Sequence, residues 1–84
     1  MRNAESYTIL VVDDFEAFRR FVNSALRGRT GFQVVEAGEG LAAIQKAEEL
    51  KPDLIVLDIL LPSLNGLEVA RRIRQFDPPQ EFFS

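Results

Sequence analysis

Short apolar runs alternate along this chain with segments whose apolar positions recur every three or four residues. The runs cover residues 7–12, 32–37 and 54–58, and they are rich in β-branched side chains, which favour strands. The last run is apolar from Leu54 to Leu57 and ends in Asp58. An uninterrupted apolar run of this length is typical of a strand buried on both faces of a parallel sheet. The pattern therefore predicts three strands.

The segments between and after these strands have the spacing of amphipathic helices, over residues 15–27, 41–50 and 66–75. The apolar residues expected on the buried faces are Phe18, Phe21, Val22, Ala25 and Leu26 in the first helix, Ala43, Ile44, Ala47 and Leu50 in the second, and Val69, Ala70, Ile73 and Phe76 in the third. Gly28 and Pro52 mark helix ends, since glycine favours the turn after a helix and proline cannot continue one.

Alternation of strands and helices predicts an α/β fold of the form βαβαβα. Such a chain builds a parallel sheet with right-handed crossovers. Residues 1–6 form a polar lead-in, and residues 77–84, with Pro78 and Pro79, are expected to be an irregular tail. With 84 residues in all, the chain corresponds to one small domain.

Composition narrows the possible functions. Hydrophobic residues make up 46% of the chain and charged residues 27%, which is ordinary for a globular protein. The absence of cysteine excludes disulfides and thiolate metal sites, and the absence of histidine removes the commonest general base. A net charge of −3 does not indicate a nucleic-acid or anionic membrane partner. With no apolar segment long enough to span a bilayer and no signal-peptide pattern at the start, a cytoplasmic protein is expected.

Arginine pairs and clusters occur on two of the predicted helices. They are Arg19 and Arg20 on the first, and Arg71, Arg72 and Arg74 on the third. Such clusters usually form a solvated helix face, and positive charge near a helix C-terminus is favourable. We expect no direct nucleic-acid contact from them.

Three carboxylates follow the predicted strands directly. Asp13 and Asp14 come after the first strand, and Asp58 ends the third. If these two strands are parallel neighbours, about 4.8 Å apart, their carboxyl ends lie at the same edge of the sheet. Carboxylates gathered there repel one another unless a cation neutralises them, and Mg²⁺ prefers such oxygen ligands. Beside a bound metal, Asp58 is a candidate nucleophile toward a phosphoryl group.

A simpler interpretation exists for each of these residues taken alone. Asp14 is a plausible N-cap of the first helix, and Asp58 could merely begin a turn. The occurrence of all three carboxylates at strand ends of one βαβαβα frame favours the metal site over separate capping roles.

Several segments together resemble the receiver (response regulator) domains of two-component signalling. The matching segments are ILVVDD at residues 9–14, AGEGLAA at 37–43, KPDL at 51–54, and DILLP at 58–62 followed by Gly66. The resemblance runs over nearly the whole chain. It implies a partial flavodoxin-like fold whose three parallel strands lie in the order 2-1-3.

The resemblance also implies roles for particular residues. Asp58 would be the phosphoacceptor, taking its phosphoryl group from a sensor histidine kinase. Asp13 and Asp14 would organise Mg²⁺, with Asp58 and the backbone carbonyl of Leu60 as further metal ligands. The chain would be a signalling module and no enzyme beyond its own phosphorylation from a phosphodonor.

A complete receiver has five strand–helix units, and the pattern here predicts three. The chain would therefore correspond to the N-terminal three-fifths of a receiver. It would lack the Ser or Thr that ends the fourth strand and the Lys that ends the fifth, which impairs phosphorylation. The third strand would be an open edge, a template for pairing with another chain. We expect a homodimer that pairs Leu54–Leu57 with its copy in antiparallel orientation and covers the exposed apolar faces.

Other functions fit less well. A shortened receiver could act as a non-phosphorylated interaction module that dimerises. A haloacid-dehalogenase-type phosphatase wants a second Asp two residues after its nucleophile, but Leu60 stands there. A flavin-binding half-domain needs a phosphate-binding loop after the first strand, and this chain has acidic residues at that position.

Overall fold

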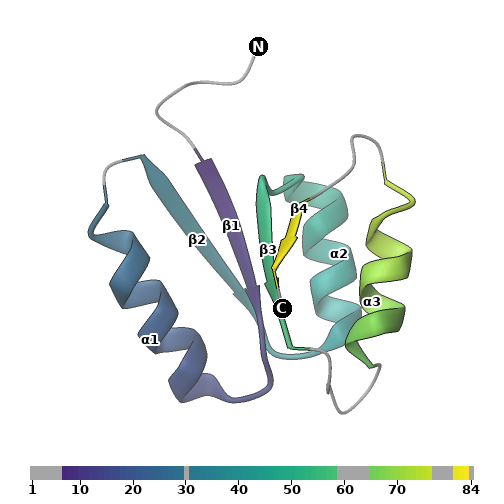
Figure 1. The fold of residues 1–84 in the computed structure, drawn as a ribbon, viewed down its shortest axis with the longest axis horizontal. Helices are drawn as coiled ribbons and strands as arrows, with labels where there is room; N and C mark the ends of the chain where they lie inside the picture. The colour runs from purple at the N-terminus through teal and green to yellow at the C-terminus, as the bar shows by residue number, and fades with distance from the viewer. Residues whose placement is uncertain (1–6, 30, 59–64, 77–80, 84) are drawn as a thin grey trace.

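A parallel four-stranded sheet with helices on both faces organises the chain. The computed structural model describes residues 7–29, 31–58, 65–76 and 81–83. The elements are β1 (Tyr7–Val12), α1 (Glu16–Arg27), β2 (Phe32–Ala37), α2 (Gly40–Leu50), β3 (Leu54–Leu57), α3 (Gly66–Ile73) and β4 (Glu81–Phe83). Strand order is β2-β1-β3-β4, with α1 on one side of the sheet and α2 and α3 on the other (Figure 1). The predicted α/β class and the 2-1-3 order of the first three strands are confirmed.

The central strand β1 is buried on both of its faces. Its residues Ile9–Val12 are each 2% exposed or less, because β2 and β3 pair with the strand and helices cover both of its faces. Alternating side chains divide the interior into two clusters. The cluster beneath α2 and α3 holds Leu10, Val12, Ala37, Ala43, Ala47, Ile55, Leu57, Val69 and Ile73, and the cluster beneath α1 holds Ile9, Val11 and Val34.

The α1 side of the sheet is only partly covered. Val22 and Leu26 pack on the sheet as predicted, but Phe18 is 40% exposed and Phe21 70% exposed, so the prediction that both are buried is wrong. The same holds for Leu50, which is 46% exposed at the end of α2. Helix α1 contacts β1 and β2. Among the described elements it is the single helix on its face of the sheet, so the part of this face near β3 has no helix over it (Figure 1).

A fourth strand is present where the sequence pattern predicted an irregular tail. Residues 81–83 pair in parallel with β3, placing Ile55 opposite Phe82 and Val56 opposite Phe83, so the prediction of an irregular tail is wrong for these residues. Two aromatic residues supply the strand propensity, and Phe82 packs against the larger core cluster. Residues 77–80 and 84 lie outside the described residues. Ser84, a hydroxyl residue, follows β4 in the sequence but is not among the described residues. The predicted absence of a Ser or Thr at the end of the fourth strand therefore stays a prediction.

The fourth strand also changes the expected dimer. With β4 paired along β3, the backbone edge of Leu54–Leu57 is occupied, so the predicted antiparallel pairing of this strand with a second copy is wrong. The two edge strands of the described sheet are β2 and β4, and β4 is only three residues long. No helix among the described residues has the length and apolar character needed to cross a membrane.

Charged and polar side chains stabilise both ends of α3. Asn65 caps the helix by accepting the backbone N–H of Glu68 at 2.9 Å. The Glu68 carboxylate accepts hydrogen bonds from the guanidinium groups of Arg71 and Arg72 one turn later. These bonds, with that from Arg71 the largest cause, lower the pKa of Glu68 from 4.5 to about 2. The predicted solvated role of this arginine cluster agrees with exposed positions on α3.

We predict that Arg71→Gln raises the pKa of Glu68 from about 2 toward 4.5, because the largest stabilising hydrogen bond to the carboxylate is lost. A carboxyl-detected NMR titration measures this directly. A lowered pKa in the folded state means that the interaction stabilises the fold above pH 4.5 and is lost as the pH falls toward 2. The Arg20→Gln variant, altered on α1, should leave the Glu68 titration unchanged. An unchanged titration in Arg71→Gln would contradict the assignment.

We also predict that Phe82→Ala lowers the free energy of unfolding by about 2–3 kcal/mol, since removal of a well-packed Phe side chain costs this much or more. Phe82 packs partly buried against the core and lies 5.1 Å beneath the Arg74 guanidinium. Its neighbour Phe83 is 65% exposed, so Phe83→Ala should cost less than about 1 kcal/mol. Urea denaturation measures both, and equal losses would show that β4 is not packed as described.

Candidate functional site: an acidic edge of the sheet

Three aspartates meet at the carboxyl edge of β1 and β3. Val12 and Leu57 are opposite one another in the parallel pair, and the Asp58 N–H donates to the Val12 carbonyl at 2.9 Å. One carboxylate oxygen from each of Asp13, Asp14 and Asp58 lies within 4.8 Å of the others. The structure thus brings together the three side chains that the sequence pattern placed at one edge.

Exposure differs among the three carboxylates. Asp13 and Asp58 are half-buried, whereas Asp14 is exposed. A donor set made only of carboxylate oxygens fits a hard divalent cation such as Mg²⁺, which keeps several waters and takes few protein ligands. Leu60, the fourth predicted ligand, lies outside the described residues. The roles of these residues as phosphoacceptor and metal ligands stay predictions.

The turn after β1 is held by backbone and side-chain hydrogen bonds of Asp13. Its N–H donates to the Ala37 carbonyl at 3.1 Å, and its Oδ1 accepts the Phe15 N–H at 2.9 Å. Helix α1 begins at Glu16 with Phe15 at the N-cap, so the prediction of Asp14 as the cap is wrong. The side chain of Asp14 is exposed at the edge.

Arg19 fixes the acidic turn to the neighbouring strand. Its Nη1 donates to the Asp13 carbonyl at 2.7 Å, and its Nε donates to Glu36 Oε1 on β2 at 3.2 Å. Asn23, one turn further along α1, donates to the other Glu36 oxygen at 2.7 Å. The Arg19 side chain is only 16% exposed, so the prediction that it belongs to a solvated face is wrong.

Sequence reasoning missed this network, although a signal was present. Arg19 and Asn23 are spaced i, i+4, which places them on one helix face. Glu36 is the acidic residue of the strand and follows Val34 and Val35, at a position that faces α1. An inward acidic residue opposite a helical Arg and Asn would have pointed to the contact.

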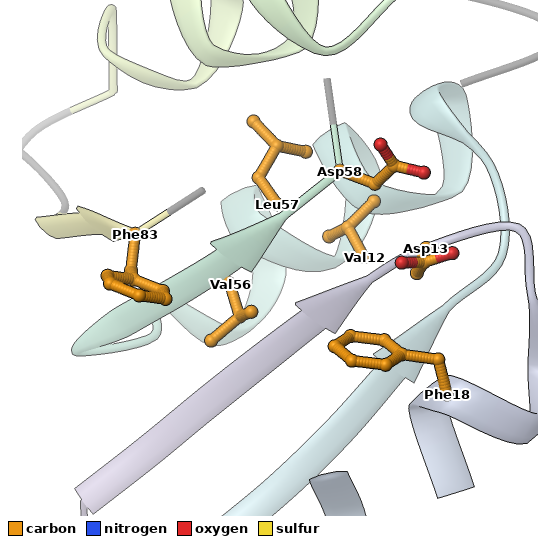
Figure 2. A pocket seen from close by; sticks show the side chains of 7 residues that line it. All are labelled: Val12, Asp13, Phe18, Val56, Leu57, Asp58 and Phe83. Carbon is orange, nitrogen blue, oxygen red and sulfur yellow. The ribbon is translucent and has the colours of Figure 1, made fainter. Parts of the chain in front are cut away.

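An apolar cavity adjoins the acidic edge on the α1 side of the sheet. Its volume is about 340 Å³, and its walls are formed by Val12, Asp13, Phe18, Val56, Leu57, Asp58 and Phe83 (Figure 2). Phe83 comes from the strand that the sequence pattern did not predict. The site therefore combines a carboxylate cluster with an apolar cavity next to it.

Comparison with known proteins shows which family this chain resembles. Residues 9–82 match the response regulator receiver domain family. The chain belongs to this family. The receiver fold and the signalling class that the sequence segments suggested are thereby confirmed, and receivers as a family are signalling modules rather than typical enzymes.

Several relatives show how much of a regulator this receiver chain represents. It is 49% identical over 67 residues to the alkaline phosphatase synthesis transcriptional regulatory protein PhoP of Bacillus subtilis, covering 80% of this chain and 28% of PhoP. The probable transcriptional regulatory protein TcrX of Mycobacterium tuberculosis is 40% identical over 80 residues, covering 93% and 34%. This receiver chain thus spans about a third or less of these relatives.

A solved structure gives the same fold. The response regulator domain of Thermotoga maritima CheB superimposes with a TM-score of 0.81 at 39% sequence identity. The match covers 88% of this receiver chain and 56% of the CheB domain chain. The agreement includes the parallel sheet on which the acidic edge is built.

We predict that Arg19→Met lowers the free energy of unfolding by about 1–3 kcal/mol, because it leaves the partly buried Glu36 carboxylate and the Asp13 carbonyl without this donor. The matched control is Arg20→Met on the same helix. Its exposed pair with Glu16 should contribute only about 0.3–0.5 kcal/mol. Thermal and urea unfolding of both variants test this. A loss in Arg19→Met no larger than that in the control would contradict the positioning role.

Proposed function

We propose that this receiver chain accepts a phosphoryl group on Asp58 from a sensor histidine kinase, in two-component phosphorelay signalling. The observation that supports the proposal most directly is the gathering of three carboxylate oxygens within 4.8 Å at the edge of a receiver-type sheet. Response regulators receive phosphoryl groups from such kinases, and Asp58 stands at the end of a buried strand where a nucleophile would be held rigidly.

In this proposal Asp13, Asp14 and Asp58, with the backbone carbonyl of Leu60, would hold Mg²⁺. The metal would supply positive charge that neutralises the phosphoryl oxygens and lowers the barrier to their approach. The protein contributes the rest through position. Arg19 and the Ala37 carbonyl fix the Asp13 backbone, so the acidic turn is ordered before any ligand binds.

The proposed transfer is a displacement at phosphorus. An oxygen of the Asp58 carboxylate forms the new O–P bond while the P–N bond to the kinase histidine breaks, and the imidazole leaves with the bonding electron pair. The product is an acyl phosphate on Asp58. The backbone N–H of Asp58 donates to the Val12 carbonyl, so β3 holds the nucleophile against β1 during the attack.

The wider role is also part of the proposal. PhoP and TcrX are named as transcriptional regulatory proteins, and we propose a cytoplasmic location for this chain by analogy with them. This chain would make no DNA contact itself, since Arg71 and Arg72 on α3 are paired with Glu68 and Arg74 lies over the Phe82 ring. We further propose that the 84 residues correspond to the first three-fifths of a receiver domain.

A second candidate function is a non-phosphorylated interaction module that dimerises. One observation favours it: Phe21 and Phe83 are 70% and 65% exposed on the α1 side of the molecule. Burying such rings against a second copy would be favourable. This dimer would use the uncovered apolar face rather than the edge of β3.

We predict that incubation with Mg²⁺ and acetyl phosphate adds one phosphoryl group, seen as a mass increase in intact-protein mass spectrometry. Here the P–O bond breaks and acetate leaves. Asp58→Ala should abolish the adduct, and chelation with EDTA should prevent it. Asp13→Asn, which keeps an oxygen that can accept the Phe15 N–H, should reduce the rate by removing charge from the metal site.

Two controls make this test decisive. Glu49→Gln, an exposed acidic position on α2, should be phosphorylated at the same rate as the unaltered chain. A full receiver domain treated in parallel shows that the conditions are adequate. If that domain is labelled while this chain gives no adduct and light scattering reports a dimer, the interaction module is the better function.

A further inference from the structure

We propose that Arg19 and Gly38 are positioning residues of the acidic edge and set its affinity for Mg²⁺. Arg19 would do so by holding the main chain of Asp13, and Gly38 by leaving room for the Arg19 guanidinium. The inference rests on the proposed function, since it concerns the same Mg²⁺ site. It adds two residues to that site and assigns neither of them a contact with the metal.

The Arg19 guanidinium joins the turn after β1 to strand β2. Its Nη1 donates to the Asp13 carbonyl at 2.7 Å, and its Nε donates to Glu36 Oε1 at 3.2 Å. The Asp13 carbonyl belongs to the planar peptide unit that links Asp13 to Asp14. The bond from Arg19 therefore fixes the main chain between two of the proposed metal ligands.

Glu36, which orients the guanidinium, is itself held from two helices. Its Oε2 accepts a hydrogen bond from Asn23 of α1 at 2.7 Å, and its backbone carbonyl accepts one from Lys46 Nζ of α2 at 2.6 Å. The Arg19 side chain is 16% exposed and that of Glu36 28% exposed, so protein partners replace much of their hydration. Arg19 thus bonds the acidic turn to an acceptor whose own position is fixed.

Gly38 lies directly against the guanidinium. A Cβ added at this position would be 3.1 Å from Arg19 Nη1, the atom that donates to Asp13, and 3.6 Å from Arg19 Cζ. That contact is tighter than ordinary van der Waals packing, so the guanidinium would have to shift by a few tenths of an ångström. The backbone of Gly38 is outside the left-handed region, so alanine can adopt it. Gly38→Ala therefore displaces the guanidinium while every charge is kept.

Charge alone and positioning predict opposite effects of Arg19. A guanidinium repels a divalent cation, so an Arg19 that acted only through its charge would weaken Mg²⁺ binding, and its removal would tighten it. A positioning residue has the reverse effect, because without it the turn must be ordered when the ion binds. Loss of a contact that supports a metal ligand typically weakens metal binding by about 10–100-fold.

The experiment titrates Mg²⁺ into the 84-residue chain at neutral pH and constant ionic strength, with the amides of Asp13, Asp14 and Asp58 followed by NMR. Arg19→Met should weaken Mg²⁺ binding by about tenfold. Gly38→Ala should weaken it by about threefold, because the bond to Asp13 is distorted rather than removed. Arg19→Lys keeps the charge but lacks the planar fork that reaches both acceptors, so it should not restore full affinity.

Two matched controls and a double variant isolate the contact. A Cβ added at Gly28 meets no atom within 4 Å, and the backbone there is helical, so Gly28→Ala should leave Mg²⁺ affinity unchanged. Arg20→Met should also leave it unchanged. The nearest atoms to the Cβ at position 38 all belong to the Arg19 guanidinium. Gly38→Ala should therefore have no further effect in a chain that already carries Arg19→Met.

A second readout requires no metal. The Phe15 N–H is bonded to Asp13 Oδ1, so its hydrogen exchange in the metal-free chain reports the order of the acidic turn. It should be faster in Gly38→Ala than in Gly28→Ala. Mg²⁺ titrations are made under conditions in which urea unfolding shows every variant to be folded, so a loss of stability alone does not lower the measured affinity.

Each result separates this inference from the proposed function. Equal or tighter Mg²⁺ binding by Arg19→Met and Gly38→Ala would overturn the inference and leave phosphorylation of Asp58 standing. A further loss from Gly38→Ala in the Arg19→Met chain would show that Gly38 acts without Arg19, which overturns its role here. The expected changes in Mg²⁺ affinity without any phosphoryl adduct would support the inference and overturn the proposed function. Absence of Mg²⁺ binding in the unaltered chain would overturn both.

Discussion

The parallel pairing of β1 with β3 is the constraint on which the site depends. Because Val12 is opposite Leu57, the residues that follow each strand emerge at the same edge of the sheet. A shift of one residue in this register would turn every side chain of β3 to the other face and bury the wrong set. The position of Asp58 beside Asp13 is therefore set by the apolar residues of the strands, and it is held against the repulsion between the acidic side chains.

Magnitudes show why the sheet tolerates this concentration of negative charge. Two unit charges 4 Å apart repel by about 1 kcal/mol in water, and partial burial increases this several-fold. Each fully buried aliphatic side chain contributes about 1.5–3 kcal/mol. The four consecutive residues Ile9–Val12 are almost completely buried, and they precede the acidic turn directly. Burial of β1 therefore outweighs the repulsion between the carboxylates.

The sequence was sufficient to predict the strands, because each has its own run of apolar residues. The first two strands have the predicted bounds, the third ends one residue earlier than predicted, and the acidic residues follow them as expected. What the pattern could not decide is whether a partner covers an apolar face. Phe18 and Phe21 have the same helical spacing as Val22 and Leu26, yet only the latter two pack against the buried cluster beneath α1.

Two other features depended on tertiary contacts that no local pattern shows. A strand of three residues is too short for its alternation to be recognised, and the prolines before it argued against any strand. Arg19 differs from its neighbour Arg20 in the sequence only by its i, i+4 spacing to Asn23, and its buried position follows from the inward Glu36 on another element. Both features became visible only when the partner strand was in place.

The fourth strand links the stability of the fold to the character of the site. Its side chains alternate, so Phe82 joins the core beneath α2 and α3 while Phe83 forms a wall of the cavity on the opposite face. The packing of Phe82 thereby holds Phe83 beside Val56. Without β4, the acidic edge would still have its three carboxylates, because these depend on β1 and β3 alone. Its apolar cavity would lose a wall, so the metal-binding and apolar parts of the site have separate structural origins.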